Sequence, residues 1–156
     1  MTTITESIQL IDLNKVDVTG FAQHVGCVVL TKDNKIMLQQ RSHDWRTFPD
    51  CLVFFGGHME VNETPMESLV RELKEELGAR VDPSQVVSLG TILETIAEDR
   101  NLIHIYFWHD KQGTITGCYE CEAKSYSDCA EAFMHPKIMD CLSWALMECQ
   151  KRQLLR

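Results

Sequence analysis

The sequence has neither a long uninterrupted apolar segment nor a cluster of basic residues. No apolar run approaches the roughly 20 residues that a membrane-spanning helix requires. The N-terminal segment MTTITESIQL also lacks the basic start and the apolar core of a secretory signal. The formal net charge is −8, whereas binding to duplex nucleic acid or to an anionic membrane requires clustered Lys and Arg. We therefore expect a soluble protein that binds neither partner.

The cysteines do not form the pattern of a disulfide framework. Seven of them are scattered through 156 residues, and this odd number favours free thiols in a reducing, cytoplasmic environment. Cys118 and Cys121 form a C-x-x-C pair, but a zinc site needs a second pair of ligands. The other Cys and His spacings supply no clear second pair, so ordinary free cysteines are the simpler interpretation, and zinc or redox chemistry the alternative.

The segment 56–79 has the strongest local pattern, a loop followed by a helix. Thr64 can be the N-cap, Pro65 the first helical residue and Glu67 the partner in a capping box. Gly78 stands where a left-handed C-terminal cap is expected. The apolar residues between these marks fall on one helical stripe: Met66, Leu69, Val70, Leu73 and Leu77. The pattern predicts a capped helix that buries this stripe.

Glu72, Glu75 and Glu76 are spaced i, i+3 and i+4 on this helix, so we expect them to share one face opposite the apolar stripe. Like charges at this spacing cost roughly 0.2–0.5 kcal/mol in an isolated helix, and a pair between Arg71 and Glu75 offsets part of that cost. The face can be a solvated acidic surface. It can instead hold a divalent cation, because Mg²⁺ binds a few carboxylates together with substrate phosphates.

The residues around the helix resemble the Nudix box. Gly57, five residues, Glu63, seven residues and then Arg71-Glu72-Leu73-Lys74-Glu75-Glu76-Leu77-Gly78-Ala79 fill every fixed position of that pattern. The resemblance implies a single Nudix domain over residues 1–156. It also implies a MutT-like hydrolase that uses Mg²⁺, or Mn²⁺, to cleave a diphosphate linkage in a nucleoside diphosphate derivative.

The rest of the chain predicts an α/β fold. We expect hairpins at 24–41 and 86–108, the second one bulged at Gly90, a short strand at 51–55 and a short edge element near residues 8–13. Ser127 can cap a short helical turn, and 137–152 reads as an amphipathic helix that packs in the core or forms a homodimer contact. Hairpins mixed with helices indicate a central mixed β-sheet covered on both faces, the α/β/α sandwich that the Nudix resemblance also implies.

The resemblance assigns roles to the residues of the site. It implies that the metal ligands are Glu72, Glu75, Glu76 and the carbonyl group of Gly57. Arg71 is then expected to orient a glutamate of the helix, and Glu63 to support the geometry of loop and helix. Many relatives carry a remote glutamate that completes the site, and here Glu122 is favoured over Glu120. One of the helix glutamates, or Glu122, takes the proton of the attacking water.

Three residues are candidates for binding the substrate. Arg41 ends the strand before the box, where relatives often direct an arginine into the substrate cleft, although a solvated strand end is the simpler alternative. Trp45 can stack on a base or pack under its own loop. Phe55 stands where relatives usually carry a proline, so we expect it to affect the loop or the wall of the pocket.

The substrate is less well defined than the reaction. A small-molecule nucleoside triphosphate, cleaved by a MutT-type pyrophosphohydrolase, is favoured, and a nucleotide sugar or ADP-ribose is the alternative. A Nudix module that senses nucleotides without hydrolysis belongs to another functional class, and the intact box argues against it. A protein whose acidic helix docks a basic partner is a third class, and the spacing of the box would then be coincidental.

Overall fold

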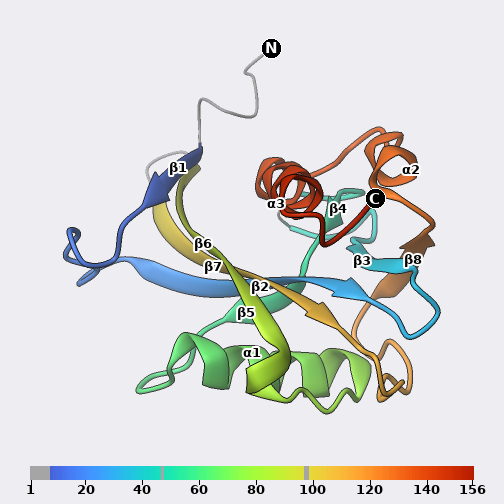
Figure 1. Ribbon diagram of the computed structural model, residues 1–156. Coiled ribbons are helices and arrows are strands. Elements are labelled where there is room, and N and C mark those ends of the chain that lie inside the picture. The colour runs from blue at the N-terminus through green and yellow to red at the C-terminus, as the bar shows by residue number, and fades with distance from the viewer. Residues whose placement is uncertain (1–7, 47, 97–98) are drawn as a thin grey trace.

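The structure, a computed structural model, describes residues 8–46, 48–96 and 99–156. Its strands are β1 (Ile8–Ile11), β2 (Ala22–Leu30), β3 (Ile36–Gln40), β4 (Leu52–Val53), β5 (Phe55–His58), β6 (Val86–Ile96), β7 (Asp99–His109) and β8 (Glu122–Tyr126). Its helices are α1 (Pro65–Leu77), α2 (Cys129–Phe133) and α3 (Asp140–Lys151), with a short 3₁₀ helix, η2 (Pro83–Gln85). Figure 1 shows how these elements are arranged.

Within the described residues, eight strands form one sheet in the order β1-β6-β7-β2-β3-β4, with β5 beside β2 and β8 beside β3. The pairing of β2 with β7 is parallel, and the other strand pairings are antiparallel. The sheet is therefore mixed, as the sequence predicts.

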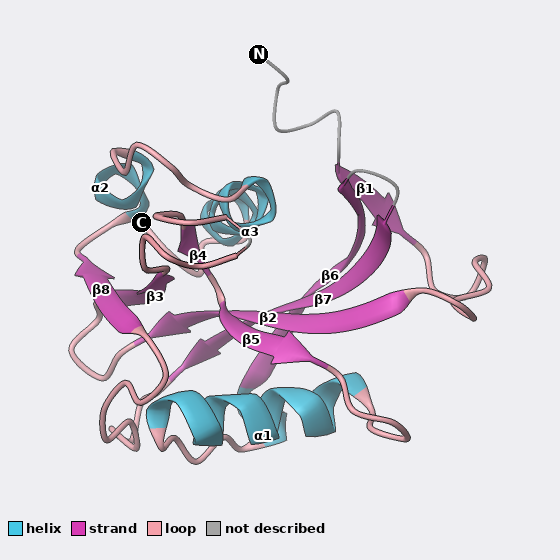
Figure 2. Cartoon of the chain, turned by 180° about the vertical axis from the view of Figure 1, so that it is seen from behind, coloured by secondary structure: helices cyan, strands magenta, loops and turns pink. Residues whose placement is uncertain are grey.

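Helices cover both faces of this sheet, with α1 on one side and α2 and α3 on the other (Figures 1 and 2). Successive side chains of a strand point to opposite faces, so β2 contributes to two cores. Val25, Cys27 and Val29 pack in the cluster that contains the apolar residues of α1. Val28 and Leu30 pack in the cluster that contains those of α3. The predicted α/β/α sandwich is confirmed.

Both predicted hairpins are present in the structure. In the first, Val29 of β2 lies opposite Met37 of β3. In the second, β6 pairs with β7 along nearly its whole length, and the register shifts between Ser88 and Gly90, where a bulge is expected from the sequence. The short N-terminal element is β1, which forms one edge of the sheet against β6.

The predicted strand at 51–55 is instead divided into β4 and β5. β4 pairs with β3, and after Phe54 the chain continues in β5, which pairs with β2. The two glycines of the box therefore lie within β5, with Gly56 opposite Gly26. Gly56 has φ +145°, and a side-chain carbon there would overlap the carbonyl group of Val25. Only glycine permits this close approach of β5 to β2.

The C-terminal helices begin later than the sequence predicts. Asp128, not Ser127, caps α2, because its carboxylate accepts a hydrogen bond from the N–H of Glu131. Residues 137–139 are not helical, because the chain there exchanges backbone hydrogen bonds with Leu52 of β4 before α3 begins. The apolar residues of α3 pack in the core, as one of the two alternatives for this helix predicts.

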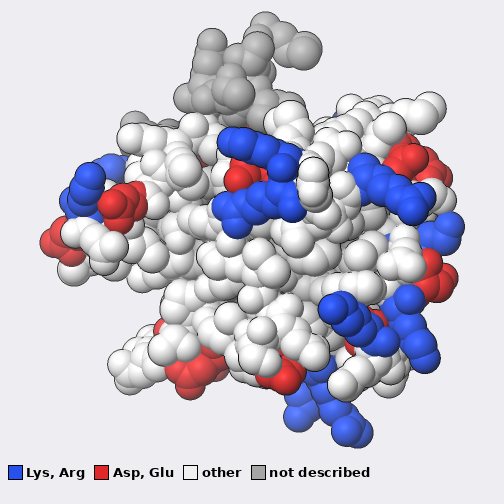
Figure 3. All heavy atoms as spheres, in the orientation of Figure 1, with Lys and Arg blue, Asp and Glu red and all other residues white. Residues whose placement is uncertain are grey.

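Two surface properties bear on binding partners. None of the described helices has the length and apolarity needed to cross a membrane. On the face that Figure 3 shows, Lys and Arg side chains occur in separate groups with acidic side chains among them.

We predict that Gly56→Ala lowers the free energy of unfolding by at least about 2 kcal/mol, because the backbone conformation alone costs a non-glycine residue about 1–3 kcal/mol. The added methyl group would also meet Val25. Urea denaturation measures the loss. Gly20→Ala is the matched control, because Gly20 has φ +86° but open space around it, so the loss there should be smaller. Equal losses in both variants would contradict the proposed close approach.

Candidate metal and catalytic site

The helix that carries the acidic residues begins and ends as the sequence predicts. The Thr64 hydroxyl group accepts from the N–H of Glu67, and the Glu67 carboxylate accepts from the N–H of Thr64, so the capping box is complete. Gly78 adopts the left-handed conformation, and its N–H donates to the carbonyl group of Lys74 at 2.9 Å. These caps fix the ends of α1, and its buried apolar residues fix which side faces β5.

The three glutamates of α1 do not share one exposed face. Glu76 is 3% exposed and Glu72 is 8% exposed, whereas the side chain of Glu75 is 48% exposed. The expectation that all three lie opposite the apolar stripe is therefore wrong for Glu72 and Glu76. Each follows a buried leucine by three residues, Leu69 or Leu73, and so lies on the side of the helix that faces the sheet.

The buried glutamates fit against β5 because β5 has no side chains at its two glycines. The N–H of Gly56 lies 3.3 Å from a carboxylate oxygen of Glu76. A side-chain carbon on Gly57 would lie only 2.8 Å from a carboxylate oxygen of Glu72. A solvated acidic surface, the simpler alternative for this helix, does not describe these two residues.

Burial changes the acidity of both carboxyl groups. Loss of solvation, reinforced by the nearby charge of Glu72, raises the pKa of Glu76 to about 9. Loss of solvation also raises the pKa of Glu72, and the adjacent Arg71 opposes this effect. A bound divalent cation would favour the ionised form of both groups, because it supplies positive charge where solvent is excluded.

Arg71 connects the loop to the helix through several hydrogen bonds. Its guanidinium group donates to both carboxylate oxygens of Glu63, at 2.7 and 3.0 Å, and to the carbonyl group of His58 at 3.1 Å. It also donates to Glu72 at 3.0 Å and to Glu75 at 3.3 Å. The bonds from Arg71 lower the pKa of Glu63 to about 2. These contacts give Arg71 and Glu63 the positions that orienting and supporting roles require.

The donor set fits a hard divalent cation such as Mg²⁺ or Mn²⁺. Carboxylate and backbone carbonyl oxygens are its usual protein ligands, and the missing side chain of Gly57 leaves space beside the Glu72 carboxylate. Among the described residues, no three His, Cys, Asp or Glu side chains are already gathered as a complete ligand shell. Mg²⁺ does not require one, because it usually keeps several waters and takes oxygens from substrate phosphates.

The segment between β7 and β8 brings Glu120, rather than Glu122, toward this site. The N–H of Tyr119 donates to the carbonyl group of Glu76 at 2.9 Å, and the charge of Glu120 contributes to the raised pKa of Glu76. Glu122 begins β8, is 65% exposed and pairs with Lys124 at 3.1 Å. The preference for Glu122 is therefore not supported, and Glu120 is the better candidate.

The three candidate substrate residues do not form one group. Arg41 stacks on Trp45, with 4.6 Å between its guanidinium carbon and the centre of the ring, and Trp45 remains partly exposed. Phe55 is fully buried in the core beneath α1. The expectation that Phe55 contacts substrate is therefore corrected: in this position it can support the wall of a pocket only from behind.

Some contacts could not be found from residue types alone. The carbonyl group of His58 holds Arg71, and the N–H of Tyr119 holds the end of α1. Backbone groups act the same way in every residue, so a single sequence carries no signal for them. His104 bonds to Thr91 and Gln23 within the sheet, so its ring has a structural role there.

The chain is similar to known proteins in sequence and in fold. A family profile described as the NUDIX domain matches residues 20–143. A CTP pyrophosphohydrolase from Escherichia coli is 30% identical over 119 residues, which cover 72% of this chain and 80% of that protein. An RNA pyrophosphohydrolase from Halorhodospira halophila is 39% identical, but the match covers 48% of this chain and only 38% of that protein. A MutT protein structure from Methanosarcina mazei has a TM-score of 0.70 at 15% identity, covering 85% of this chain and 95% of the other.

We predict that, without metal, the Glu76→Gln variant is more stable than the parent protein, and that this difference grows as the pH rises. Below about pH 9 the folded protein keeps Glu76 protonated, whereas the unfolded chain ionises this group near its ordinary pKa of 4.5. Ionisation therefore favours unfolding increasingly between these values. In chelator, the variant should match the parent near pH 5 and exceed its free energy of unfolding at pH 9 by roughly 1–3 kcal/mol.

Urea denaturation at both pH values measures this difference. Glu75→Gln is the matched control, because an exposed ion pair contributes at most about 1 kcal/mol and little of it should change across this range. A Glu76→Gln variant less stable than the parent at pH 9 in chelator would show that burial of this carboxyl group is not unfavourable.

Proposed function

Because this chain belongs to the Nudix family, we propose that it is a divalent-metal-dependent hydrolase that cleaves a diphosphate linkage in a nucleoside diphosphate derivative. The observation that carries the proposal is the pair of buried carboxyl groups, Glu72 and Glu76, placed against two glycines of β5. Their burial lowers stability unless a cation binds, so it is explained by function rather than by folding.

The reaction requires positive charge that the protein lacks. The substrate is a polyphosphate and the chain has a net charge of −8, so the two would repel each other. Bound Mg²⁺ or Mn²⁺ would neutralise phosphate charge and favour deprotonation of the attacking water. We propose that Glu72, Glu75, Glu76 and the carbonyl oxygen of Gly57 hold the metal.

The other residues of the site orient the metal ligands or accept the proton of the attacking water. Arg71 orients Glu72 and Glu75 through its charge-assisted bonds, and Glu63 holds Arg71 in place. Glu75 and Glu120 are exposed to solvent, so either can accept the proton of an attacking water. We keep Glu76 as a further candidate for this role, because a bound cation would favour its ionised form, and only that form can accept a proton.

The favoured substrate is a nucleoside triphosphate, cleaved to a nucleoside monophosphate and pyrophosphate. The CTP pyrophosphohydrolase supports this choice, because the match covers most of both chains. ADP-ribose and nucleotide sugars are the alternatives. The exposed part of Trp45 is available to stack on a base, with Arg41 supporting the ring. Binding of a nucleotide without hydrolysis is the proposal from another functional class.

We predict that the purified protein with Mg²⁺ converts a nucleoside triphosphate to the monophosphate and pyrophosphate. The panel should contain CTP, the other ribo- and deoxyribonucleoside triphosphates, ADP-ribose, a nucleotide sugar and a 5′-triphosphorylated RNA, with products separated by chromatography. Glu75→Gln and Glu76→Gln should each lower kcat by at least about a hundredfold, the scale for loss of a general base or metal ligand.

Glu67→Gln is the matched control on the same helix, because Gln can keep the capping bond to Thr64 and lies outside the acidic site. Near-normal turnover of both Glu75→Gln and Glu76→Gln with Mg²⁺ would refute the site. Tight nucleotide binding without cleavage of any compound would favour the sensing module.

A second comparison separates the two remote glutamates. We predict that Glu120→Gln lowers kcat by at least about tenfold, because a positioned carboxylate near the reacting water contributes to proton transfer. Glu122→Gln should stay within about twofold of the parent, because it removes only an exposed ion pair with Lys124. Steady-state kinetics on the best substrate decide the matter, and a larger effect of Glu122→Gln would reverse the assignment.

A further inference from the structure

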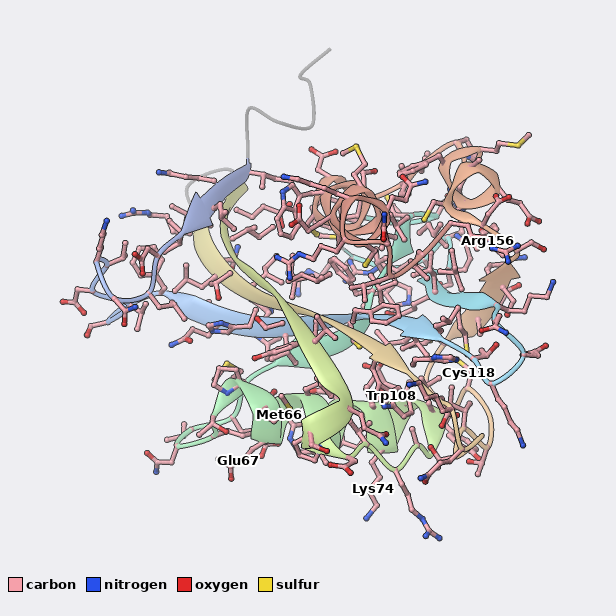
Figure 4. All side chains as sticks on the ribbon, viewed as in Figure 1. Met66, Glu67, Lys74, Trp108, Cys118 and Arg156 are labelled. Atoms are coloured by element: carbon pink, nitrogen blue, oxygen red, sulfur yellow. The ribbon has the colours of Figure 1, made fainter. Side chains whose placement is uncertain are left out.

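Two thiols meet beside the acidic site, in the segment that connects β7 to β8. The sulfur atoms of Cys118 and Cys121 are 3.2 Å apart, and the Cys118 sulfur lies 2.9 Å from the carbonyl oxygen of Cys121. Both side chains are half-buried against the core that contains α1, so neither thiol is fully enclosed. Figure 4 shows Cys118 above the C-terminal end of α1.

The other cysteines differ from this pair. Cys27, Cys129, Cys141 and Cys149 are buried in the two cores, where thiols are usually inert. Cys51 is also half-buried. It precedes β4, which pairs with the end of β3 that lies away from the β2–β3 hairpin. The C-x-x-C pair is thus the place where two accessible thiols lie next to each other.

The backbone around the pair is attached to the metal-binding helix. The N–H of Thr116 donates to the carbonyl group of Leu77, and the N–H of Tyr119 donates to that of Glu76, both at 2.9 Å. Tyr119 and Glu120 lie between the two cysteines in the sequence. A change in the distance between the sulfur atoms must therefore be absorbed by the residues that contact the end of α1.

We propose that Cys118 and Cys121 are a redox modification site, at which a reversible intramolecular disulfide forms and lowers the activity of the adjacent acidic site. The oxidant is a low-molecular-weight disulfide. One protein thiolate attacks it, forming a mixed disulfide and releasing one small thiolate. The second protein thiolate then attacks the mixed disulfide at the protein sulfur and releases the other. The two protein protons end on the two small thiols, so the protein loses two hydrogen atoms and the oxidant gains them.

The effect on activity follows from the geometry. A disulfide bond is about 2.05 Å long, so the two sulfur atoms must approach each other by about 1 Å from their present 3.2 Å. The S–H of Cys118 is also lost, and with it the contact to the carbonyl group of Cys121. The contraction acts on Tyr119 and Glu120 and moves Glu120 relative to Glu76. This consequence rests on the proposed function, whereas formation of the disulfide does not.

The chemical part is tested by incubating the metal-free protein with oxidised glutathione and then alkylating the remaining thiols. We expect the peptide containing Cys118 and Cys121 to become lighter by two hydrogen atoms, to resist alkylation and to recover with dithiothreitol. Cys118→Ser and Cys121→Ser should carry at most a glutathione adduct, and Cys51→Ser should behave as the parent. If both thiols of the pair can still be alkylated after equilibration with oxidised glutathione, the proposed modification site is wrong.

The functional part compares the reduced and oxidised proteins. We expect oxidation to lower kcat at least about tenfold, because a misplacement of about 1 Å can cost up to 10²-fold. We also expect oxidation to weaken the binding of Mn²⁺ in the absence of substrate. The electron paramagnetic resonance signal of Mn²⁺ measures this binding. The double variant Cys118→Ser, Cys121→Ser should give the same values before and after oxidant. Disulfide formation with unchanged kcat and unchanged Mn²⁺ affinity would overturn the coupling. If the reduced protein cleaves no substrate, the proposed function fails, and the thiol and Mn²⁺ measurements still decide this proposal.

Discussion

The site depends on the burial of two carboxyl groups where a sheet and a helix come unusually close. Glu72 and Glu76 can turn inward only because β5 presents glycines at positions 56 and 57, and Gly56 in turn lies tightly against β2. A side chain at Gly56 would overlap the backbone of β2, and one at Gly57 would meet the Glu72 carboxylate. The unfavourable burial of charge is partly offset by Arg71, which joins the loop, the strand and the helix through one planar group.

In this arrangement, the residues that stabilise the fold are different from the acidic residues of the candidate site. The apolar residues of β2 and α1 form one core, and α3 closes the other, so the sandwich holds together without the acidic residues. The acidic residues occupy one edge of the first core, where they lower stability in the absence of a cation. A bound metal would reverse that effect by binding the folded chain alone. Stability and metal affinity are therefore linked through the same two side chains.

The sequence predicts most of the fold and the capped helix that carries the acidic residues, for physical reasons that are local. The caps of α1, the two hairpins and the bulge at Gly90 depend on neighbouring residues and were expected. The inward orientation of Glu72 and Glu76 was not, because two carboxyl groups on a helix are normally assigned to solvent. The preference for Glu122 over Glu120 is not supported by the structure for a related reason: the strand begins at residue 122, and the loop before it follows α1 through backbone bonds. Phe55 was misplaced because the division of its strand depends on tertiary pairing.

The parallel pairing of β2 with β7 has a consequence for how the molecule assembles. Ala22 to Leu30 align with Asn101 to His109, segments separated in the sequence by β3, β5 and α1. Local contacts between α1, β5 and β2 can form early, because they involve a short stretch of chain, whereas the parallel ladder requires closure of a long loop and is intrinsically slow. During synthesis, the strand that supports the glycines therefore has one open edge until the second hairpin emerges. In that interval this edge is open to pairing with another chain, and β7 closes it when the parallel ladder forms.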